Sequence, residues 1–310
     1  MSSLEKHHNP PPSSIEFDGV DYTLTETFDG GASPVGRYAP PPGVASKHIA
    51  VKYFNPSLPT LPSVARDAHD VWREVREPLL RAGFPDYFEC HPTHQVVEFA
   101  HGIDAGTLSD YRDDFPIPEI RNLLLGVIPQ VDAMMKNGVV HGDIKPANLV
   151  VDLRRLRTTE WPTTLIDPDT MRRRDFTTES LFGTPFYMPP EVARGSYHKT
   201  TDAFSLAMTA IDLLSGKRYG EKLGNKALYG IRTNAPRAII LMRSFNCVFK
   251  PNARKIMSST LIPKAADCRT ELHQLLDFIF RCGDSDPDAR PQSGSEMIQI
   301  LTTKPNRIEI

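Results

Sequence analysis

The hydrophobic pattern changes near residue 100, and this change constrains the fold more than any other feature of the chain. Before it, residues 47–54 alternate apolar and polar side chains, as a half-buried strand does, and residues 94–99 are typical of another strand. After it, apolar residues recur at helical spacing over longer segments, namely 118–136, 200–215, 270–280 and 292–301. Strands first and helices afterwards predict an α+β architecture of two lobes, and clefts between such lobes are common ligand sites.

Composition sets the boundaries of the predicted domain. Residues 1–14 combine polar side chains with a run of three prolines, so we expect a disordered N-terminal tail. The remaining residues, 15–310, then form one domain, with 15–100 as a small β-rich lobe and 101–310 as a larger helical lobe. Within the first lobe a helix is expected from Ser63 to Leu80, and Pro78 should end or kink it.

Charge and cysteine content exclude several classes of protein. The net charge of -2 gives no reason to expect a nucleic-acid partner or an anionic membrane surface. The oligomeric state is left open by the sequence. The four cysteines are far apart and form no C-x-x-C pair, which favours a reducing compartment. No segment approaches the roughly 20 apolar residues of a membrane helix, so we expect a soluble, cytoplasmic protein.

Residues 141–152, which read HGDIKPANLVVD, place an acid, a base and an amide at fixed offsets after a long predicted helix. Phosphoryl transfer needs each of these groups. Asp143 could orient an attacking hydroxyl and accept its proton, and Lys145 could neutralise charge on the transferred phosphoryl group. The amide oxygen of Asn148 could hold a magnesium ion.

A second carboxylate follows nineteen residues after Asn148, where the apolar segment Thr164–Ile166 ends on Asp167. We expect Asp167 to join Asn148 as a ligand of Mg²⁺, which prefers hard oxygen atoms and few protein ligands. Each aspartate alone would be read as an ordinary turn residue. The ordered set, with a short strand between its members, favours chemistry.

With these motifs the chain resembles the serine/threonine protein kinases from about residue 20 to residue 302, with landmarks in the family's order. Residues 49–52 resemble the strand whose lysine contacts the α- and β-phosphates, and Glu74, or else Glu77, resembles its helix partner. Val97 resembles the residue that gates the adenine pocket, and residues 98–100 resemble the hinge. The resemblance implies ATP and Mg²⁺ as cofactors and a nucleotide site of Gly30, Gly31, Gly36, Ala50, Lys52, Glu74, Glu98, Ala100 and Val150.

The helical lobe carries the remaining landmarks. Residues 182–191 resemble the end of an activation segment, with Pro189 where the family commonly has alanine. Residues 201–207 resemble the core helix that follows, and Asp202 alone would be read as a helix N-cap. Glu191 and Arg290 resemble a buried structural ion pair, and losing either partner should destabilise this lobe by about 3–5 kcal/mol.

Three departures from the family pattern bear on function. The phosphate-covering loop retains only Gly30, Gly31 and Gly36, and Pro34 removes one N–H donor from it. Gly142 stands where many kinases have an arginine that binds a phosphorylated activation loop, so we expect activity that does not depend on phosphorylation within residues 177–180. Asp167-Pro168-Asp169 replaces D-F-G, which predicts a segment held near one conformation, with Asp169 as an additional candidate metal ligand.

Two other functions compete with a serine/threonine kinase acting on proteins. A small-molecule phosphotransferase would share H-G-D followed by asparagine and an acid pair, but Lys145 and Thr184 favour a serine or threonine hydroxyl of a protein. A pseudokinase scaffold would explain the degraded phosphate loop, but the groups needed for in-line transfer are retained.

Two further expectations concern structure. The arginine run at 172–174 is expected to be a solvated charge cluster, and residues 219–264 are expected to be helical.

Overall fold

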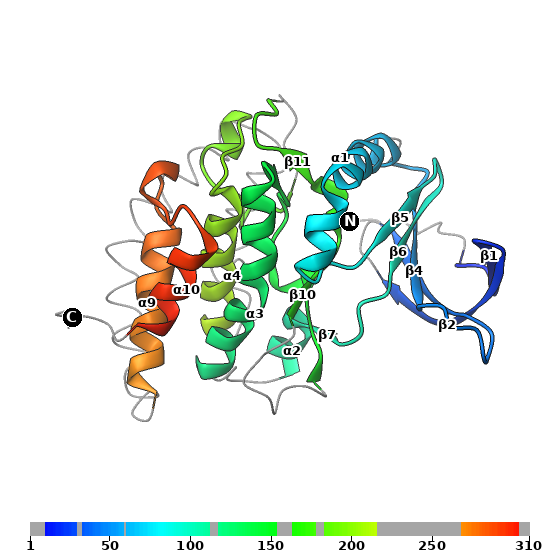
Figure 1. The fold of residues 1–310 in the computed structure, drawn as a ribbon, viewed down its shortest axis with the longest axis horizontal. Coiled ribbons are helices and arrows are strands. Elements are labelled where there is room, and N and C mark those ends of the chain that lie inside the picture. The colour runs from blue at the N-terminus through cyan, green and yellow to red at the C-terminus, as the bar shows by residue number, and fades with distance from the viewer. Residues whose placement is uncertain are drawn as a thin grey trace, which may run out of the picture. The chain divides into compact units, whose positions relative to one another are not determined.

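The computed structural model describes residues 10–29, 33–58, 60–111, 117–153, 163–177, 183–215 and 268–303. The chain divides into two compact units, one of residues 1–76 and 85–100 and one of residues 77–84 and 101–310. The first unit contains a six-stranded antiparallel sheet, and most of the helices that the structure describes lie in the second unit, as Figure 1 shows. The α+β class predicted from the sequence is therefore confirmed. The predicted helices at 219–264 lie outside the described residues.

The first unit is built on a six-stranded antiparallel sheet with the strand order β1-β2-β3-β4-β6-β5. Its strands are β1 (Ser14–Phe17), β2 (Val20–Asp29), β3 (Pro34–Ala39), β4 (Ile49–Tyr53), β5 (Tyr87–Cys90) and β6 (His94–Glu98). On β4, Ile49 and Val51 are buried in a cluster with Tyr38 and Val96, whereas Ala50 and Lys52 point to the opposite face of the sheet. The alternation predicted from residues 47–54 is thus confirmed.

The N-terminal segment contributes to this sheet. Residues 1–9 of the expected tail lie outside the described residues, but Ser14 begins β1. The carbonyl of Ser13 accepts a hydrogen bond from the N–H of Leu24 at 2.9 Å, and the carbonyl of Pro12 accepts one from the Tyr38 hydroxyl at 2.9 Å. The prolines of residues 1–14 predicted a disordered tail. These two hydrogen bonds instead hold Ser13 against β2 and Pro12 against β3.

Helix α1 (Leu61–Arg81) continues past Pro78 instead of ending there. Trp72 and Leu79 are fully buried and seven residues apart, which places them on one face of the helix. Proline removes one helical hydrogen bond, and near the end of a helix that loss is small beside the burial of a leucine. Glu74 and Glu77 lie on the exposed side of α1.

The second unit is a helical assembly in which α3, α4, α9 and α10 pack side by side, as seen in Figure 1. Its helices are α2 (Ala105–Tyr111), α3 (Ile117–Lys136), α4 (Thr201–Ser215), α9 (Arg269–Cys282) and α10 (Gly294–Thr302). The four longer ones match the segments predicted from helical spacing, with ends shifted by at most two residues. The buried residues of helix α3, among them Leu124, Val131 and Met135, lie along one broad face of the helix.

Short strands flank the loops of the second unit. One sheet has the order β10-β9-β7 and the other pairs β11 with β8. Their bounds are β7 (Ile103–Asp104), β8 (Val139–Val140), β9 (Leu149–Val151), β10 (Thr163–Leu165) and β11 (Arg172–Arg173). Single 3-10 turns complete the loops, at Pro146–Asn148, Pro168–Thr170, Val192–Arg194 and Pro287–Ala289.

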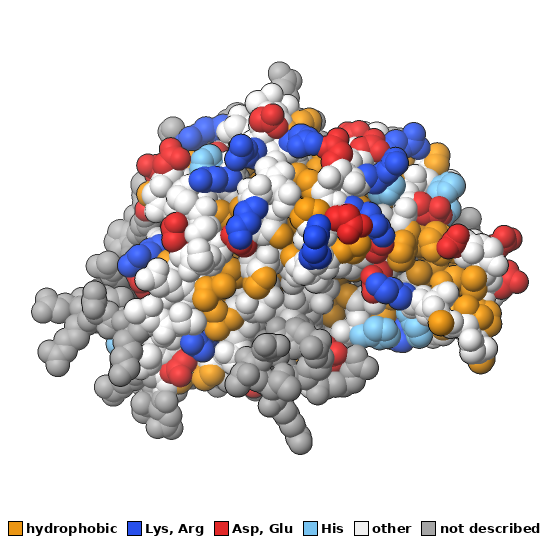
Figure 2. All heavy atoms as spheres, viewed as in Figure 1, with side chains coloured by type: hydrophobic (Ala, Val, Ile, Leu, Met, Phe, Trp, Pro, Cys, Tyr) orange, Lys and Arg blue, Asp and Glu red, His pale blue; other side chains and the backbone are white. Residues whose placement is uncertain are grey.

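The surface agrees with the near-neutral net charge. On the face seen in Figure 2, acidic and basic side chains of the described residues are interspersed and do not gather by sign. Within the described ranges, none of the helices combines the length and the apolar character that crossing a membrane requires.

Candidate active site

The loop between β8 and β9, residues 141–148, is held in place by Asp202 of α4. One carboxylate oxygen of Asp202 accepts the backbone N–H of His141 at 2.7 Å, and the other accepts that of Gly142 at 3.0 Å. The reading of Asp202 as a cap of its own helix is therefore wrong, because its oxygens bond to a loop 60 residues away. Burial raises the pKa of Asp202, while His141 and the two N–H groups counteract the shift.

His141 anchors the loop from inside the second unit. Its side chain is fully buried, and its Nε2 lies 3.1 Å from the carbonyl oxygen of Ile166. Because a carbonyl only accepts, Nε2 must carry the hydrogen. Burial lowers the pKa of His141, and the carboxylates of Asp202, Asp143 and Asp167 only partly oppose the shift. The ring is therefore neutral near pH 7 and links the loop to the residue before Asp167.

Thr170 makes a contact with the loop at 141–148 that could not be predicted from the sequence. Its hydroxyl donates to the carbonyl oxygen of His141 at 2.8 Å, so the turn after Asp167 is tied to the loop. A threonine three residues after Asp167 carries no local signal, since the bond depends on two segments 29 residues apart meeting in space.

Two glycines let the activation segment approach the loop. Gly142 and Gly183 have φ values of +80° and +101°, which side chains rarely adopt. A Cβ at Gly183 would lie 2.3 Å from the carbonyl oxygen of Gly142, and one at Gly142 would lie 3.2 Å from that of Thr170. Phe182 and Ser180 lie outside the described residues. The departure at Gly142 thus coincides with a backbone conformation that disfavours arginine.

Asp143 is the centre of a compact polar cluster. The ammonium of Lys145 donates to one of its oxygens at 2.6 Å, and the backbone N–H of Thr184 donates to the other at 2.7 Å. Lys145 also donates to the Thr184 hydroxyl at 2.9 Å. The Asp143 side chain is 11% exposed and that of Lys145 is 25% exposed, so the cluster is shielded but reachable.

Asn148 belongs to the same cluster, and Asp167 lies next to it. The amide nitrogen of Asn148 donates to the backbone carbonyl of Asp143 at 2.9 Å, which leaves its amide oxygen for another partner. The N–H of Ile166 donates to the carbonyl of Asn148 at 3.0 Å, so Asp167 follows directly beside this residue. A carboxylate and an amide oxygen are ligands that fit Mg²⁺.

Asp167 has a backbone conformation that is uncommon for its residue type. Its φ of 65° is left-handed, and among the described residues it shares a positive φ with only one other non-glycine residue, Asp18. Pro168 then starts a 3-10 turn and is buried. Such conformations persist where the surroundings impose them, and here Pro168 fixes the following φ.

The nucleotide-binding residues predicted for the first unit lie on and beside β4. Lys52 pairs with Val35 of β3 and Gln95 of β6, and Ala50 pairs with Arg37 and Val97. Of the three predicted glycines, Gly30 and Gly31 lie outside the described residues. A Cβ at Gly36 would lie 2.6 Å from the Tyr38 ring, which gives this glycine a packing role.

The predicted hinge is partly engaged within the first unit. The N–H of Glu98 donates to the carbonyl of Asp86 at 2.7 Å, and that of Phe99 donates to the carbonyl of His48 at 2.9 Å. The Glu98 carboxylate bonds to Lys47 at 2.8 Å. Val150, the remaining predicted residue, is buried in β9 of the second unit.

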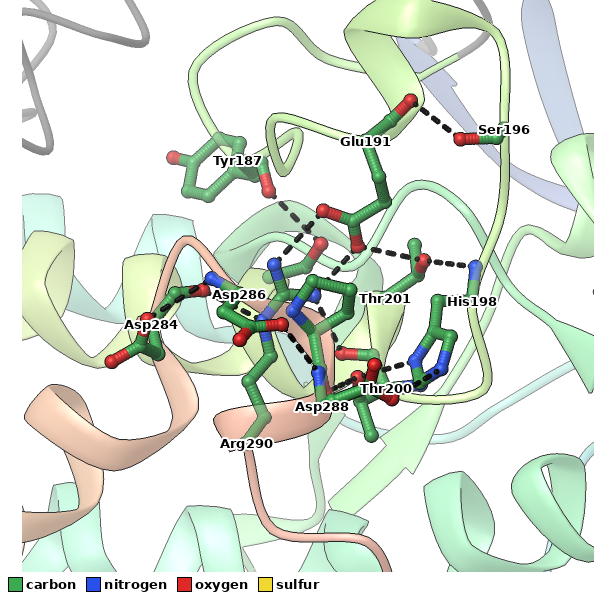
Figure 3. A network of polar contacts seen from close by, with 12 residues as sticks. Tyr187, Glu191, Ser196, His198, Thr200, Thr201, Asp284, Asp286, Asp288 and Arg290 are labelled. Atoms are coloured by element: carbon green, nitrogen blue, oxygen red, sulfur yellow. Dashed lines mark hydrogen bonds and ion pairs between the residues drawn. The ribbon is translucent and has the colours of Figure 1, made fainter.

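Below the activation segment lies a buried polar network, shown in Figure 3. Arg290 donates to both oxygens of Glu191, at 2.6 and 2.9 Å, and its Nε donates to the carbonyl of Asp284 at 2.7 Å. The Thr201 hydroxyl donates a further hydrogen bond to a carboxylate oxygen of Glu191 at 3.1 Å. The pair expected from the sequence is confirmed, and its groups are buried and hydrogen-bonded as such a pair requires.

Arg172 differs from the solvated charge run expected at 172–174. It is 3% exposed, and its guanidinium carbon lies 5.7 Å from the centre of the Phe176 ring. For this residue the solvated interpretation is wrong, because β11 pairs with β8 and draws the side chain inward.

Comparison with known proteins identifies the family of this chain. The protein kinase domain family matches residues 86–302, which include Asp143, Asp167 and Arg290 but begin after Lys52. The chain is 27% identical over 191 residues to a serine/threonine-protein kinase C of Synechocystis, covering 56% of this chain and 35% of that one. It is 32% identical over 108 residues to the serine/threonine-protein kinase PknA of Nostoc, covering 32% of this chain and 18% of the relative. With ste20 of Emericella nidulans the identity is 26% over 166 residues, covering 49% and 19%.

These matches therefore span about a third or less of the relatives' own lengths. The matched family covers well over half of this chain and includes the loop, the activation segment and the buried ion pair. The chain belongs to the protein kinase family.

Proposed function

We propose that this protein is a serine/threonine protein kinase that transfers the γ-phosphate of ATP to a hydroxyl of a protein substrate. The observation that supports it best is the cluster in which Lys145 bridges Asp143 and Thr184, at 2.6 and 2.9 Å. Scaffolding alone does not require an aspartate, a lysine and a threonine to converge beside an asparagine and a second acid.

In this proposal Asp143 orients the acceptor hydroxyl and takes its proton as the oxygen attacks phosphorus. The N–H of Thr184 fixes one Asp143 oxygen at 2.7 Å, so the carboxylate has one defined orientation. Lys145 sits where it can balance negative charge on the transferred group, which is the dominant requirement of phosphoryl transfer.

Asn148 and Asp167 would hold Mg²⁺ through an amide and a carboxylate oxygen. The ion would neutralise charge on the phosphates of ATP. The residues of the chain would supply its position: Asn148 is fixed by its amide bond to the Asp143 carbonyl, and Asp167 is fixed by the backbone turn that Pro168 begins. Lys52 would contact the α- and β-phosphates, with Glu74 or Glu77 as its partner, and the glycines 30, 31 and 36 would cover them.

The acceptor would be a serine or threonine of a protein. Thr184 and Lys145 form one side of the cluster, and the segment from Gly183 continues through Tyr187, whose hydroxyl donates to Asp212 at 2.6 Å. This bond and the Ser205 hydroxyl, which donates to the Tyr187 carbonyl at 2.9 Å, support a firm platform for an extended peptide. A small-molecule phosphotransferase has no evident need for such a platform.

Activity would not depend on phosphorylation of the activation segment. Gly142 brings no cation to the loop, and two contacts hold the segment just before residue 178. Arg172 lies against Phe176, and Thr177 bridges to Ser196 by backbone pairing. Replacing Thr177, Thr178 and Ser180 together with alanine should leave transfer intact, and loss of transfer with unchanged ATP binding would contradict this.

The decisive experiment measures transfer from [γ-³²P]ATP with Mg²⁺ to generic protein substrates, for the native chain and for Asp143→Asn. Asp277→Asn is a matched control, because it removes one charge from a surface ion pair with Arg281 on α9. Transfer to serine or threonine that Asp143→Asn abolishes and Asp277→Asn retains supports the kinase. ATP binding without transfer would instead indicate a scaffold, and transfer restricted to small metabolites would indicate the other alternative.

A further inference from the structure

The hairpin that joins β5 to β6 gathers two histidines and a glutamate at its tip. The N–H of His91 donates to the carbonyl of His94 at 2.7 Å, which closes a turn of four residues containing Pro92. Cys90 pairs with Gln95 just below this turn. Glu89, His91 and His94 are therefore brought to one place by a short hydrogen-bonded loop, and no element of the second unit is needed to assemble them.

The three side chains lie close enough together to share one ion. One ligand atom from each lies within 4.8 Å of the other two. The Nε2 of His91 lies 3.5 Å from a Glu89 oxygen, and the rings of His91 and His94 are parallel with centroids 4.9 Å apart. Ligands bound tetrahedrally at about 2.0–2.2 Å from a metal are separated by about 3.4 Å. Because the lone pairs of imidazole lie in the ring plane, two parallel rings do not face one ion. The ring of His91, which is more than half exposed, must therefore turn before its nitrogen and that of His94 bind the same metal.

The orientation of His94 is already set by its neighbours. Its Nδ1 lies 3.0 Å from the hydroxyl of Thr93, and its ring lies against Tyr53 with centroids 5.9 Å apart. When the Thr93 oxygen accepts from Nδ1–H, the lone pair of His94 resides on Nε2. Histidine ligands of metals characteristically use one nitrogen for the metal and the other for such a hydrogen bond.

We propose that Glu89, His91 and His94 form a zinc site on the first unit, with water completing the coordination. Two imidazoles and one carboxylate favour Zn²⁺ over Mg²⁺ or Ca²⁺, which prefer oxygen ligands alone. The His91 side chain is 53% exposed and that of Glu89 is 39% exposed, so an ion can enter from solvent. This site is chemically different from the magnesium ligands of the second unit, and it does not depend on the proposed phosphoryl transfer.

A bound ion would cross-link strands β5 and β6 of the sheet. His94 pairs with Tyr53, and the next residue of β6, Gln95, pairs with Lys52. Joining Glu89 of β5 to His94 of β6 through a metal would therefore fix the edge of the sheet beside the strand that carries Lys52. Because a metal that binds the folded state preferentially stabilises it, Zn²⁺ should raise the melting temperature.

The test titrates the metal-free full chain, prepared by dialysis against a chelator, with Zn²⁺ in a calorimeter and with Co²⁺ in a spectrophotometer. We expect one site of micromolar or tighter affinity and Co²⁺ absorption bands typical of nitrogen and oxygen ligands. His91→Ala and Glu89→Gln should each weaken this site at least about tenfold and remove the rise in melting temperature.

The control is His273→Ala, which removes a partly exposed histidine of α9 and should leave Zn²⁺ binding unchanged. It is needed because the chain has ten histidines, so stoichiometry alone does not locate the site. His91 is exposed, and Glu89→Gln keeps the shape of the side chain, so both variants should fold, as circular dichroism of the metal-free proteins will verify. Equal Zn²⁺ affinity in the native chain and His91→Ala, or no binding tighter than about 100 µM, would overturn the proposal.

Discussion

Glu191 and Arg290, which are 99 residues apart, meet in a bidentate ion pair whose nitrogen–oxygen distances are 2.6 and 2.9 Å. The Arg290 side chain is fully buried, and its guanidinium lies 5.1 Å from the centre of the Phe204 ring. The pair joins the end of the activation segment to the loop before α10. It therefore connects the part of the chain proposed to bind substrate with the helical core.

Breaking this pair should destabilise the protein strongly. Arg290→Met removes the cation and leaves the Glu191 carboxylate buried, so we expect the free energy of unfolding to fall by about 3–5 kcal/mol. Arg281→Met is the matched control, because its ion pair with Asp277 is exposed and should contribute about 0.3–0.5 kcal/mol. Urea denaturation measures both. Equal effects of the two substitutions would contradict a buried, coupled pair.

Gly183 should tolerate no side chain. Gly183→Ala places a Cβ 2.3 Å from a backbone oxygen and also forces alanine into a left-handed conformation. Gly83→Ala separates these effects, because its φ of +91° is also positive but nothing lies within 4 Å of the new Cβ. We expect about 1–2 kcal/mol of destabilisation at Gly83 and clearly more at Gly183, measured by thermal or urea unfolding. Similar losses at both positions would show that the close approach to Gly142 is unimportant.

Acid should weaken the fold through His141. Burial depresses the pKa of His141 in the folded chain below the usual value near 6.5, so the unfolded chain binds the proton more readily. The free energy of unfolding should therefore decrease as the pH falls below about 6.5 and should be unaffected by this group at higher pH.

The measurement compares urea midpoints of the native chain and His141→Gln between pH 5 and pH 8. Glutamine retains an N–H that can reach the carbonyl of Ile166 and does not titrate. The difference between the two curves isolates His141 from the other histidines. If the pH dependence is the same in both proteins, groups other than His141 cause the sensitivity to acid.

The Thr184 hydroxyl should matter for transfer more than for folding. Thr184→Val keeps the shape and the backbone N–H bond to Asp143 but removes the oxygen bonded to Lys145 at 2.9 Å. If the proposed kinase reaction occurs, kcat should drop by about 10–100-fold, because small displacements of catalytic groups have effects of this size. Thr184→Ser retains the hydroxyl and should recover most of the rate. An unchanged kcat of Thr184→Val would show that the Thr184 hydroxyl does not position Lys145 for transfer.

Periodic and local features could be predicted from the sequence. The strand at 49–53 and the helix at 117–136 have buried positions that follow the residue pattern, whereas polar Gln95 is buried in the strand at 94–98. Asp143, Lys145 and Asn148 are close together in the sequence, and a short turn suffices to bring them into one cluster. Of the two effects predicted for Pro78, the ending of the helix is wrong, because burial of Leu79 outweighs one lost helical hydrogen bond. The histidine and glutamate cluster of the β5–β6 hairpin was overlooked although all its members lie within six residues.

By itself, the sequence determined the order of strands and helices and the chemical groups of the loop at 141–148, because hydrophobic spacing and short turns act over a few residues. Only the tertiary structure decided what holds that loop. Asp202 accepts its N–H groups, His141 is buried against Ile166, and Gly183 passes close to the Gly142 carbonyl. Each contact joins segments at least 25 residues apart, so its partner is fixed by the packing of helices and strands and not by neighbours in the chain.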